Sequence, residues 1–166
     1  VVQVAKELRR ILDELELPSY VKTSGASGLH LLIPMGRRYT HQEVKTFARL
    51  LAVLGVEALP EISTVARPLR AREGKVYIDS GQNGHGNTIV APYSVRPLPG
   101  APASCPLSWD EVTARLDPAR FTIRTLPKRF EKMEDPLTPV LTGAADMGTA
   151  LAAIERRLGG EGEANA

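Results

Sequence analysis

Residues 76–112 read VYIDSGQNGHGNTIVAPYSVRPLPGAPASCPLSWDEV, and the architecture can be inferred by working outward from them. The run at 75–79 is rich in β-branched and aromatic residues, which predicts a strand that ends at Asp79. Residues 87–91 are a second short strand candidate. Glycine-rich and proline-rich stretches lie around them and predict loops, followed by an extended segment over 92–106. Short strands between irregular connections indicate a small sheet.

A hairpin is expected earlier in the chain. Residues 19–23 and 29–33 are two strand-like runs, and the glycine-rich turn SGASG at 24–28 separates them. Helices flank the hairpin. Apolar residues recur at helical spacing over 1–17 until Pro18 stops the pattern.

Thr40 and Glu43 form a capping box that opens a second helix, which we expect to end near Gly55. Further turns or helices are expected over 60–67, after Ser108, over 126–133 and over 144–158. Gly159-Gly160 is expected to end the last of these. The mixture predicts an α+β fold with a small, mostly antiparallel sheet flanked by helices. We expect one domain over 1–160 and a disordered tail over 161–166.

Composition narrows the class of protein. The chain has 166 residues, a formal net charge of +2 and a single cysteine, Cys105, which excludes an internal disulfide and a multi-cysteine zinc site. No apolar run is long enough to span a bilayer, and the first segment is charged, so a cytoplasmic protein without a membrane partner is expected. Basic residues nevertheless cluster locally, which favours phosphate binding. The clusters are Arg67, Arg70, Arg72 and Lys75, and Lys128, Arg129 and Lys132.

Three places could carry chemistry. The turn KTSGASGLH at 22–30 offers backbone amides and the hydroxyl of Ser24 to an anion, with His30 just beyond. Asp79 leaves a strand at a loop mouth beside Gln82, a suitable place for a hard cation. Arg96 lies on a proline-fixed segment and could hold a phosphate with two hydrogen bonds. Taken singly, each has an ordinary alternative: a glycine hairpin, a turn-capping aspartate and a surface arginine.

Three stretches together make a pattern: KTSGASGLHLLIP at 22–34, the long stretch at 76–112, and DPARFTIRTLPKRF at 117–130. In this order and spacing they resemble the polymerase domain of bacterial ligase D, which belongs to the archaeo-eukaryotic primase superfamily. The resemblance implies a primase-polymerase-like fold. It also implies metal-dependent transfer of nucleotides to the 3′ end of a DNA primer during non-homologous end joining.

The resemblance also implies roles for single residues. Ser24 and His30 would contact the triphosphate of the incoming nucleotide, and Asp79 would be a catalytic ligand of Mn²⁺ or Mg²⁺. Gln82, near Asp79, and Arg96 would also belong to the nucleotide-binding site. The expected partners are gapped or 5′-phosphorylated DNA ends and nucleoside triphosphates, mostly ribonucleotides. A DNA ligase and Ku are further expected partners, and the expected location is the cytoplasm, in association with the nucleoid.

Two departures from the family pattern matter. The family carries an Asp-x-Asp metal-binding pair on a strand just before the first helix. This sequence opens on that helix, so we expect an N-terminally incomplete domain in which Asp79 alone binds metal weakly. Ser27 stands where the family usually has lysine, a loss for which Lys22 or a metal could compensate.

Other functions stay open at this point. The chain could bind nucleotides or DNA ends without turnover, or it could be a degenerate fragment. A metal phosphoesterase built around Asp79 and His30 would need further ligands that the sequence does not show.

Overall fold

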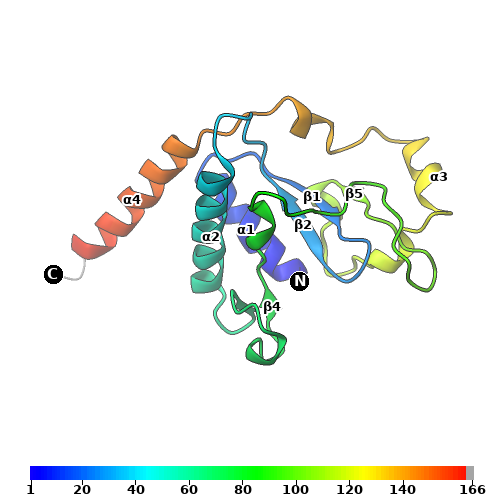
Figure 1. Ribbon diagram of the computed structural model, residues 1–166, viewed down its shortest axis with the longest axis horizontal. Helices are drawn as coiled ribbons and strands as arrows, with labels where there is room; N and C mark the ends of the chain where they lie inside the picture. The colour runs from blue at the N-terminus through cyan, green and yellow to red at the C-terminus, as the bar shows by residue number, and fades with distance from the viewer. Residues whose placement is uncertain (164–166) are drawn as a thin grey trace.

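The computed structural model describes residues 1–163 and forms an α+β fold, as the sequence predicts (Figure 1). The helices are α1 Val2–Glu14, α2 His41–Ala58, α3 Leu126–Phe130 and α4 Met147–Glu163. The strands are β1 Tyr20–Thr23, β2 Leu29–Leu32, β3 Ser63–Thr64, β4 Val76–Tyr77 and β5 Pro106–Leu107. Single 3₁₀ turns cover Leu69–Ala71, Gly81–Asn83, Trp109–Glu111, Pro118–Arg120 and Thr138–Leu141.

The main sheet has three antiparallel strands in the order β2-β1-β5. The predicted hairpin is confirmed, because Tyr20 pairs with Leu32 and Thr23 with Leu29 around the 24–28 turn. β1 is the central strand, with Val21 opposite Leu31 on one side and Leu107 on the other. Pro106 is tolerated in β5 because that strand is at an edge, where a missing backbone donor does little harm. β3 and β4 form a separate parallel pair.

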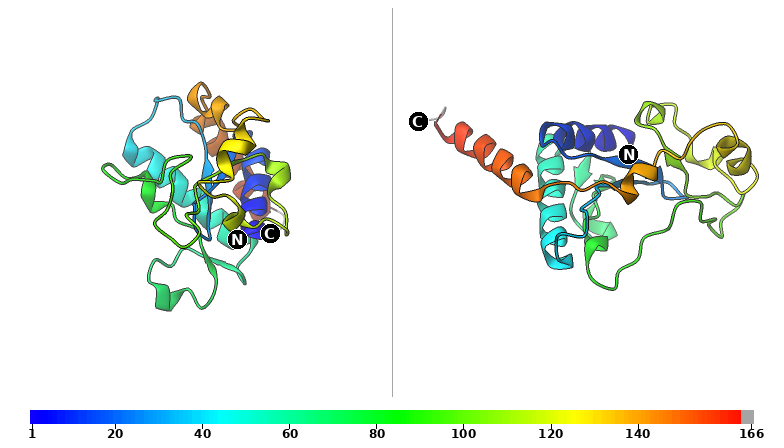
Figure 2. Two further views of the ribbon diagram at one scale, coloured as in Figure 1. Left: turned by 90° about the vertical axis from the view of Figure 1, so that its right-hand side faces the viewer. Right: turned by 90° about the horizontal axis from the view of Figure 1, so that it is seen from above.

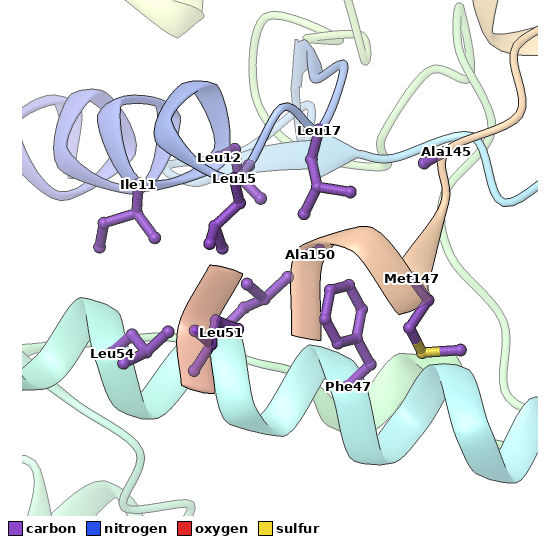
Figure 3. Close-up of a cluster of buried hydrophobic side chains, with 11 residues drawn as sticks. Ile11, Leu12, Leu15, Leu17, Phe47, Leu51, Leu54, Ala145, Met147 and Ala150 are labelled. Atoms are coloured by element: carbon purple, nitrogen blue, oxygen red, sulfur yellow. The ribbon is translucent and has the colours of Figure 1, made fainter. Parts of the chain in front are cut away.

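Two apolar clusters hold these elements together. The first joins the helices: Phe47 and Leu51 point from α2 toward Leu12 of α1, with the first turns of α4 beside them (Figure 3). The second lies against the main sheet. Its buried members are Ala5, Val21, Ala103, Cys105, Leu107, Val112 and Leu126. Helix α1 contributes to both clusters, which fixes the hairpin relative to α2.

Helices α4 and α3 lie on opposite sides of the molecule. Helix α4 reaches out on one side of the body and α3 lies at the far side, with the hairpin between them (Figures 1 and 2). No helix of the described residues is long and apolar enough to cross a membrane.

Several predicted boundaries are wrong. Helix α2 continues past Gly55 to Ala58. The glycine at 55 is explained by the close approach of α1 and does not mark a helix end, since a Cβ there would lie 2.7 Å from Leu8 Cδ2. Residues 87–91 form no strand. Residues 60–67 contain β3, which the local pattern could not predict because its partner β4 comes later in the chain.

The last helix starts at Met147 and runs through Gly159-Gly160 to Glu163. Glycine lowers helix propensity by only about 1 kcal/mol, so a glycine pair does not have to stop a helix. The predicted tail over 161–166 therefore overlaps α4, and residues 164–166 lie outside the described residues.

Replacing Leu51 by alanine should destabilise the fold, because this side chain is 6% exposed and lies in the helix cluster. A buried leucine truncated to alanine typically costs about 2–5 kcal/mol. The matched control is Leu69→Ala, whose side chain is 81% exposed. We expect that change to stay within about 0.5 kcal/mol in urea unfolding. Equal effects of the two substitutions would contradict the helix cluster as described.

Candidate functional site

The turn at residues 24–28 is organised by the hydroxyl of Ser24. Its Oγ accepts hydrogen bonds from the backbone N–H groups of Ala26 at 3.2 Å and Gly28 at 3.1 Å. The backbone of Ser24 also donates to the carbonyl of Gly28 at 2.9 Å. The hydrogen bonds of residues 1–163 leave the hydroxyl proton of Ser24 free to donate to a ligand. Ser27, at the tip of the turn, is exposed.

Arg96 packs directly on this turn. Gly25 has a φ of 74°, and a Cβ there would lie 2.7 Å from Arg96 Cγ and 3.0 Å from the backbone N of Ser104. Only glycine suits both the conformation and the close approach. The Nε of Arg96 is buried and has no hydrogen-bond partner among the described residues. A cationic group with an unpaired buried donor beside a hydroxyl-bearing turn is suited to an anion.

His30 lies on β2 opposite Lys22 of β1, in the direct register of the hairpin. The Nζ of Lys22 is 2.9 Å from His30 Nδ1. The same ammonium donates to the carbonyl of Val90 at 2.8 Å and to Ser104 Oγ at 2.8 Å. Lys22 is 1% exposed, so these three acceptors take the place of water.

Burial and neighbouring charges keep His30 neutral. Burial first, and then the cations of Lys22 and Arg96, lower the pKa of His30 to about 4, although Asp79 acts in the opposite direction. Burial and the charge of Arg96 likewise lower the pKa of Lys22 to about 8. Near pH 7, His30 is therefore an uncharged imidazole and Lys22 is mostly a cation.

Asp79 is exposed just beyond the end of β4. Its Oδ1 accepts a hydrogen bond from the backbone N–H of Gly81 at 2.9 Å and another from the hydroxyl of Tyr77 at 3.3 Å. The Gln82 amide lies 3.5 Å from Oδ2. Gln82 is thus adjacent to the carboxylate.

A cavity of about 460 Å³ lies between α1, β2 and β4, and three predicted site residues line it: His30, Asp79 and Gln82. The rest of its wall is mostly apolar, including Leu8, Leu31 and Ile78. Ser24 and Arg96 are not part of this wall. They lie beside it, because Arg96 packs on the turn that joins β1 to β2.

The described residues around Asp79 supply only part of a binding site for a divalent cation. Mg²⁺ and Mn²⁺ favour several oxygen ligands in octahedral geometry. Asp79 supplies one carboxylate with an oxygen facing the loop. Within residues 1–163, no group of three His, Cys, Asp or Glu side chains could hold a metal ion. Asp79 therefore suits the role of one ligand, and the described residues do not complete the set.

The polar partners of His30 were missed by reasoning from the sequence. The sequence suggested for Lys22 only that its positive charge could replace, near the phosphates, that of the family lysine missing at position 27. In the structure the ammonium of Lys22 lies within hydrogen-bonding distance of three groups inside the protein, His30 Nδ1, the Val90 carbonyl and Ser104 Oγ. That its charge compensates for the lysine missing at 27 stays a prediction. The available signal was a lysine between Val21 and Thr23 in a strand that is otherwise buried. Ser104 and Val90 carried no signal, since they are remote in sequence.

Comparisons with known proteins show which protein family the chain resembles. The model of the LigD primase-polymerase domain matches residues 1–137. The polymerase domain of Mycobacterium tuberculosis ligase D, solved in complex with DNA, superposes with a TM-score of 0.77 at 28% identity. That match covers 87% of this chain and 50% of the solved chain.

Curated relatives agree. The bifunctional non-homologous end joining protein LigD of Bacillus subtilis is 40% identical over 136 residues, which is 81% of this chain and 22% of the relative. The multifunctional LigD of Pseudomonas aeruginosa is 37% identical over 152 residues, or 90% of this chain and 18% of the relative. The chain belongs to the LigD primase-polymerase domain family. It spans about a fifth of the length of these relatives.

Replacing Gly25 by alanine should disturb the site and the fold together. The added Cβ meets both a positive φ and the backbone of residues 103–104. We expect a loss of about 2–4 kcal/mol in unfolding free energy. Gly100→Ala is the matched control, since Gly100 has a φ of 83° with nothing within 4 Å of a Cβ. That control should lose only about 1 kcal/mol. Equal losses would show that conformation alone, without the close contact, requires glycine at 25.

His30 should make stability depend on pH below neutrality. Its ordinary pKa is about 6.5 and its folded pKa is about 4, so the unfolded chain binds more protons between these values. The stabilisation is complete above about pH 6.5 and is lost as the pH falls through about 4.

Urea unfolding from pH 7 to 4 tests this dependence. His30→Asn keeps an acceptor near the position of Nδ1 and cannot titrate, so its stability should fall less steeply than that of the parent. Parallel curves for the two proteins would contradict a depressed pKa at His30.

Proposed function

We propose that this chain is the nucleotide-binding part of a polymerase that extends DNA ends in non-homologous end joining. The observation that carries the proposal is the meeting of His30, Asp79 and Gln82 on one cavity, in a chain of the LigD polymerase family. Ser24, on the turn between β1 and β2, and Arg96, which packs against that turn, lie beside it.

The proposed substrate is a nucleoside triphosphate, by family resemblance a ribonucleotide. Its phosphates would accept hydrogen bonds from the hydroxyl of Ser24, the outward ring N–H of His30 and the guanidinium of Arg96. These groups suit a polyanion because the guanidinium stays charged near neutral pH and each of the three offers a hydrogen-bond donor to a phosphate oxygen. Gln82 would hold the carboxylate of Asp79 in place through its amide.

The proposed reaction is nucleotidyl transfer. The 3′-hydroxyl oxygen of the primer attacks the α-phosphorus, a new P–O bond forms, and the bond to the β-phosphate breaks so that pyrophosphate leaves. Asp79 would be one ligand of Mn²⁺ or Mg²⁺, whose chemistry is to lower the pKa of the hydroxyl and balance charge on the phosphates. The residues of this chain would hold the triphosphate in line with the primer.

DNA ends, gapped or 5′-phosphorylated, are the proposed macromolecular partner, which would place the protein on the nucleoid in the cytoplasm. Support comes from the exposed Arg67 and Arg70, which precede β4 and Asp79 on the connection from β3. Basic side chains near the reacting atoms can neutralise the DNA backbone. A DNA ligase and Ku are proposed as further partners by family resemblance.

A second function has an observation in its favour. Because residues 1–163 contain no group of three metal-ligating side chains, the chain could bind nucleotides or DNA ends without turnover. Catalysis would then need carboxylates from outside these residues.

Primer extension distinguishes the two functions. The substrate is a gapped, 5′-phosphorylated DNA with Mn²⁺ and ribonucleotides. The chain is assayed alone and joined to the upstream segment that carries Asp-x-Asp in the family. We expect extension only in the joined form, and a loss of about 10³-fold or more in Asp79→Ala, because a lost metal ligand removes charge stabilisation.

Asp110→Ala is the matched control, since Asp110 is an exposed aspartate away from the cavity, and its extension rate should match the parent. Extension by the chain alone would contradict the need for further carboxylates. Inactivity of both forms, with nucleotide binding retained, would favour the binding function.

A further inference from the structure

We infer that Lys22 is a positioning residue of this site: it holds the imidazole of His30 in the tautomer that carries its proton on Nε2. The outer nitrogen is then a hydrogen-bond donor of fixed direction for a phosphate oxygen. The inference rests on the proposed function for its ligand, but the tautomer itself does not.

The ammonium of Lys22 has three hydrogen-bonding neighbours. An ammonium has three N–H donors and no lone pair. Two donors are assigned without ambiguity, one to the carbonyl of Val90 and one to Ser104 Oγ, each at 2.8 Å. The third faces His30 Nδ1 at 2.9 Å. Nδ1 must therefore accept, and a neutral imidazole that accepts at Nδ1 carries its proton on Nε2.

The hydroxyl of Ser104 would compete with Lys22 as a donor only if its own proton were free. Its Oγ donates to the carbonyl of Thr23 at 2.7 Å. The proton of the hydroxyl is thereby engaged, and a lone pair is left for Lys22. Ser104 is fully buried, so water does not offer an alternative partner. Because Ser104 donates to Thr23, it can only accept from Lys22.

Lys22 also contacts segments beyond the hairpin. Val90 lies on the segment that leads from Asp79 toward Arg96, and Ser104 pairs with residues 93 and 94 through its backbone. Lys22 therefore ties the hairpin, which carries Ser24 and His30, to the segment that carries Asp79 and Arg96 and to the segment of Ser104 that pairs with it. A lysine used in this way presents no donor to the ligand, so its effect on binding must pass through His30 and these segments.

Nitrogen-detected NMR of the histidine rings tests the tautomer without any ligand. At pH 7 the parent should show His30 with an unprotonated Nδ1 and a protonated Nε2, assigned by the loss of these signals in His30→Asn. Lys22→Met removes the donors and should move the Nδ1 signal toward the protonated range. Lys22→Gln has a shorter amide donor and should retain the parent pattern at least in part. A protonated Nδ1 in the parent, or an unchanged ring in Lys22→Met, would overturn the inference.

Binding of ATP with Mn²⁺ then tests positioning against a purely structural role. Lys22→Met and His30→Asn should each weaken binding by about tenfold, a size typical for loss of a supporting partner. The double variant should be no weaker than His30→Asn alone, because both changes remove the same donor. Lys45→Met, at an exposed lysine of α2 outside both basic clusters, is the control and should bind like the parent.

Additive losses in the double variant would mean that Lys22 acts on the nucleotide by another route, which overturns positioning through His30. Circular dichroism and thermal unfolding of each variant exclude simple loss of fold. Absence of ATP binding in the parent would contradict the proposed nucleotide site in this chain. In that case the NMR result would still decide whether Lys22 sets the tautomer.

Discussion

The ammonium of Lys22 is almost completely removed from water, and three acceptors from distant parts of the chain surround it. A buried charge is tolerated only where each of its donors is satisfied. His30, Val90 and Ser104 must therefore stay in place together. This constraint joins the hairpin, the loop after Asp79 and the segment before β5, and through them it orders the groups around the proposed nucleotide site. Burial of the imidazole, and then the cation of Lys22 beside it, lower the pKa of His30 and keep it neutral.

The surrounding scaffold makes this arrangement possible. β1 is the middle strand of the sheet, and its three residues after Tyr20 are all buried. The helix cluster on one side and the sheet cluster on the other meet at α1, so the hairpin cannot shift without disturbing both. Close contacts at Gly25 and Gly55 add to this rigidity, because in both places another segment occupies the space of a side chain. A turn held in this way, with Arg96 packed on it, keeps Ser24 and Arg96 in place without rearrangement.

The carboxylate side of the site is organised differently. Asp79 is exposed and depends on its own loop, through Gly81 and Gln82, for hydrogen bonds. Its carboxylate lies in the wall of a mostly apolar cavity. The proposed phosphate-binding groups are held by packing, whereas the described residues bring only one carboxylate near them, so nucleotide binding and turnover are separate proposals. The match covers only half of the solved relative, so the other half of that chain could supply further metal ligands in the family.

Local patterns in the sequence were sufficient for the hairpin, the capping box at Thr40 and Glu43, the start of each long helix to within a few residues, and the α+β class. These features depend on neighbours within a few positions, where turn residues, caps and apolar spacing act directly. The family motifs also named Ser24, His30, Asp79, Gln82 and Arg96, but not how they meet. Only the tertiary structure decided that His30, Asp79 and Gln82 share a cavity, that Gly55 lies inside a helix, and that β3 pairs with β4. It alone turned Lys22 inward to Ser104, which lies 82 positions away. Hydrogen bonds and packing over such separations depend on the whole chain, so no local pattern could predict them.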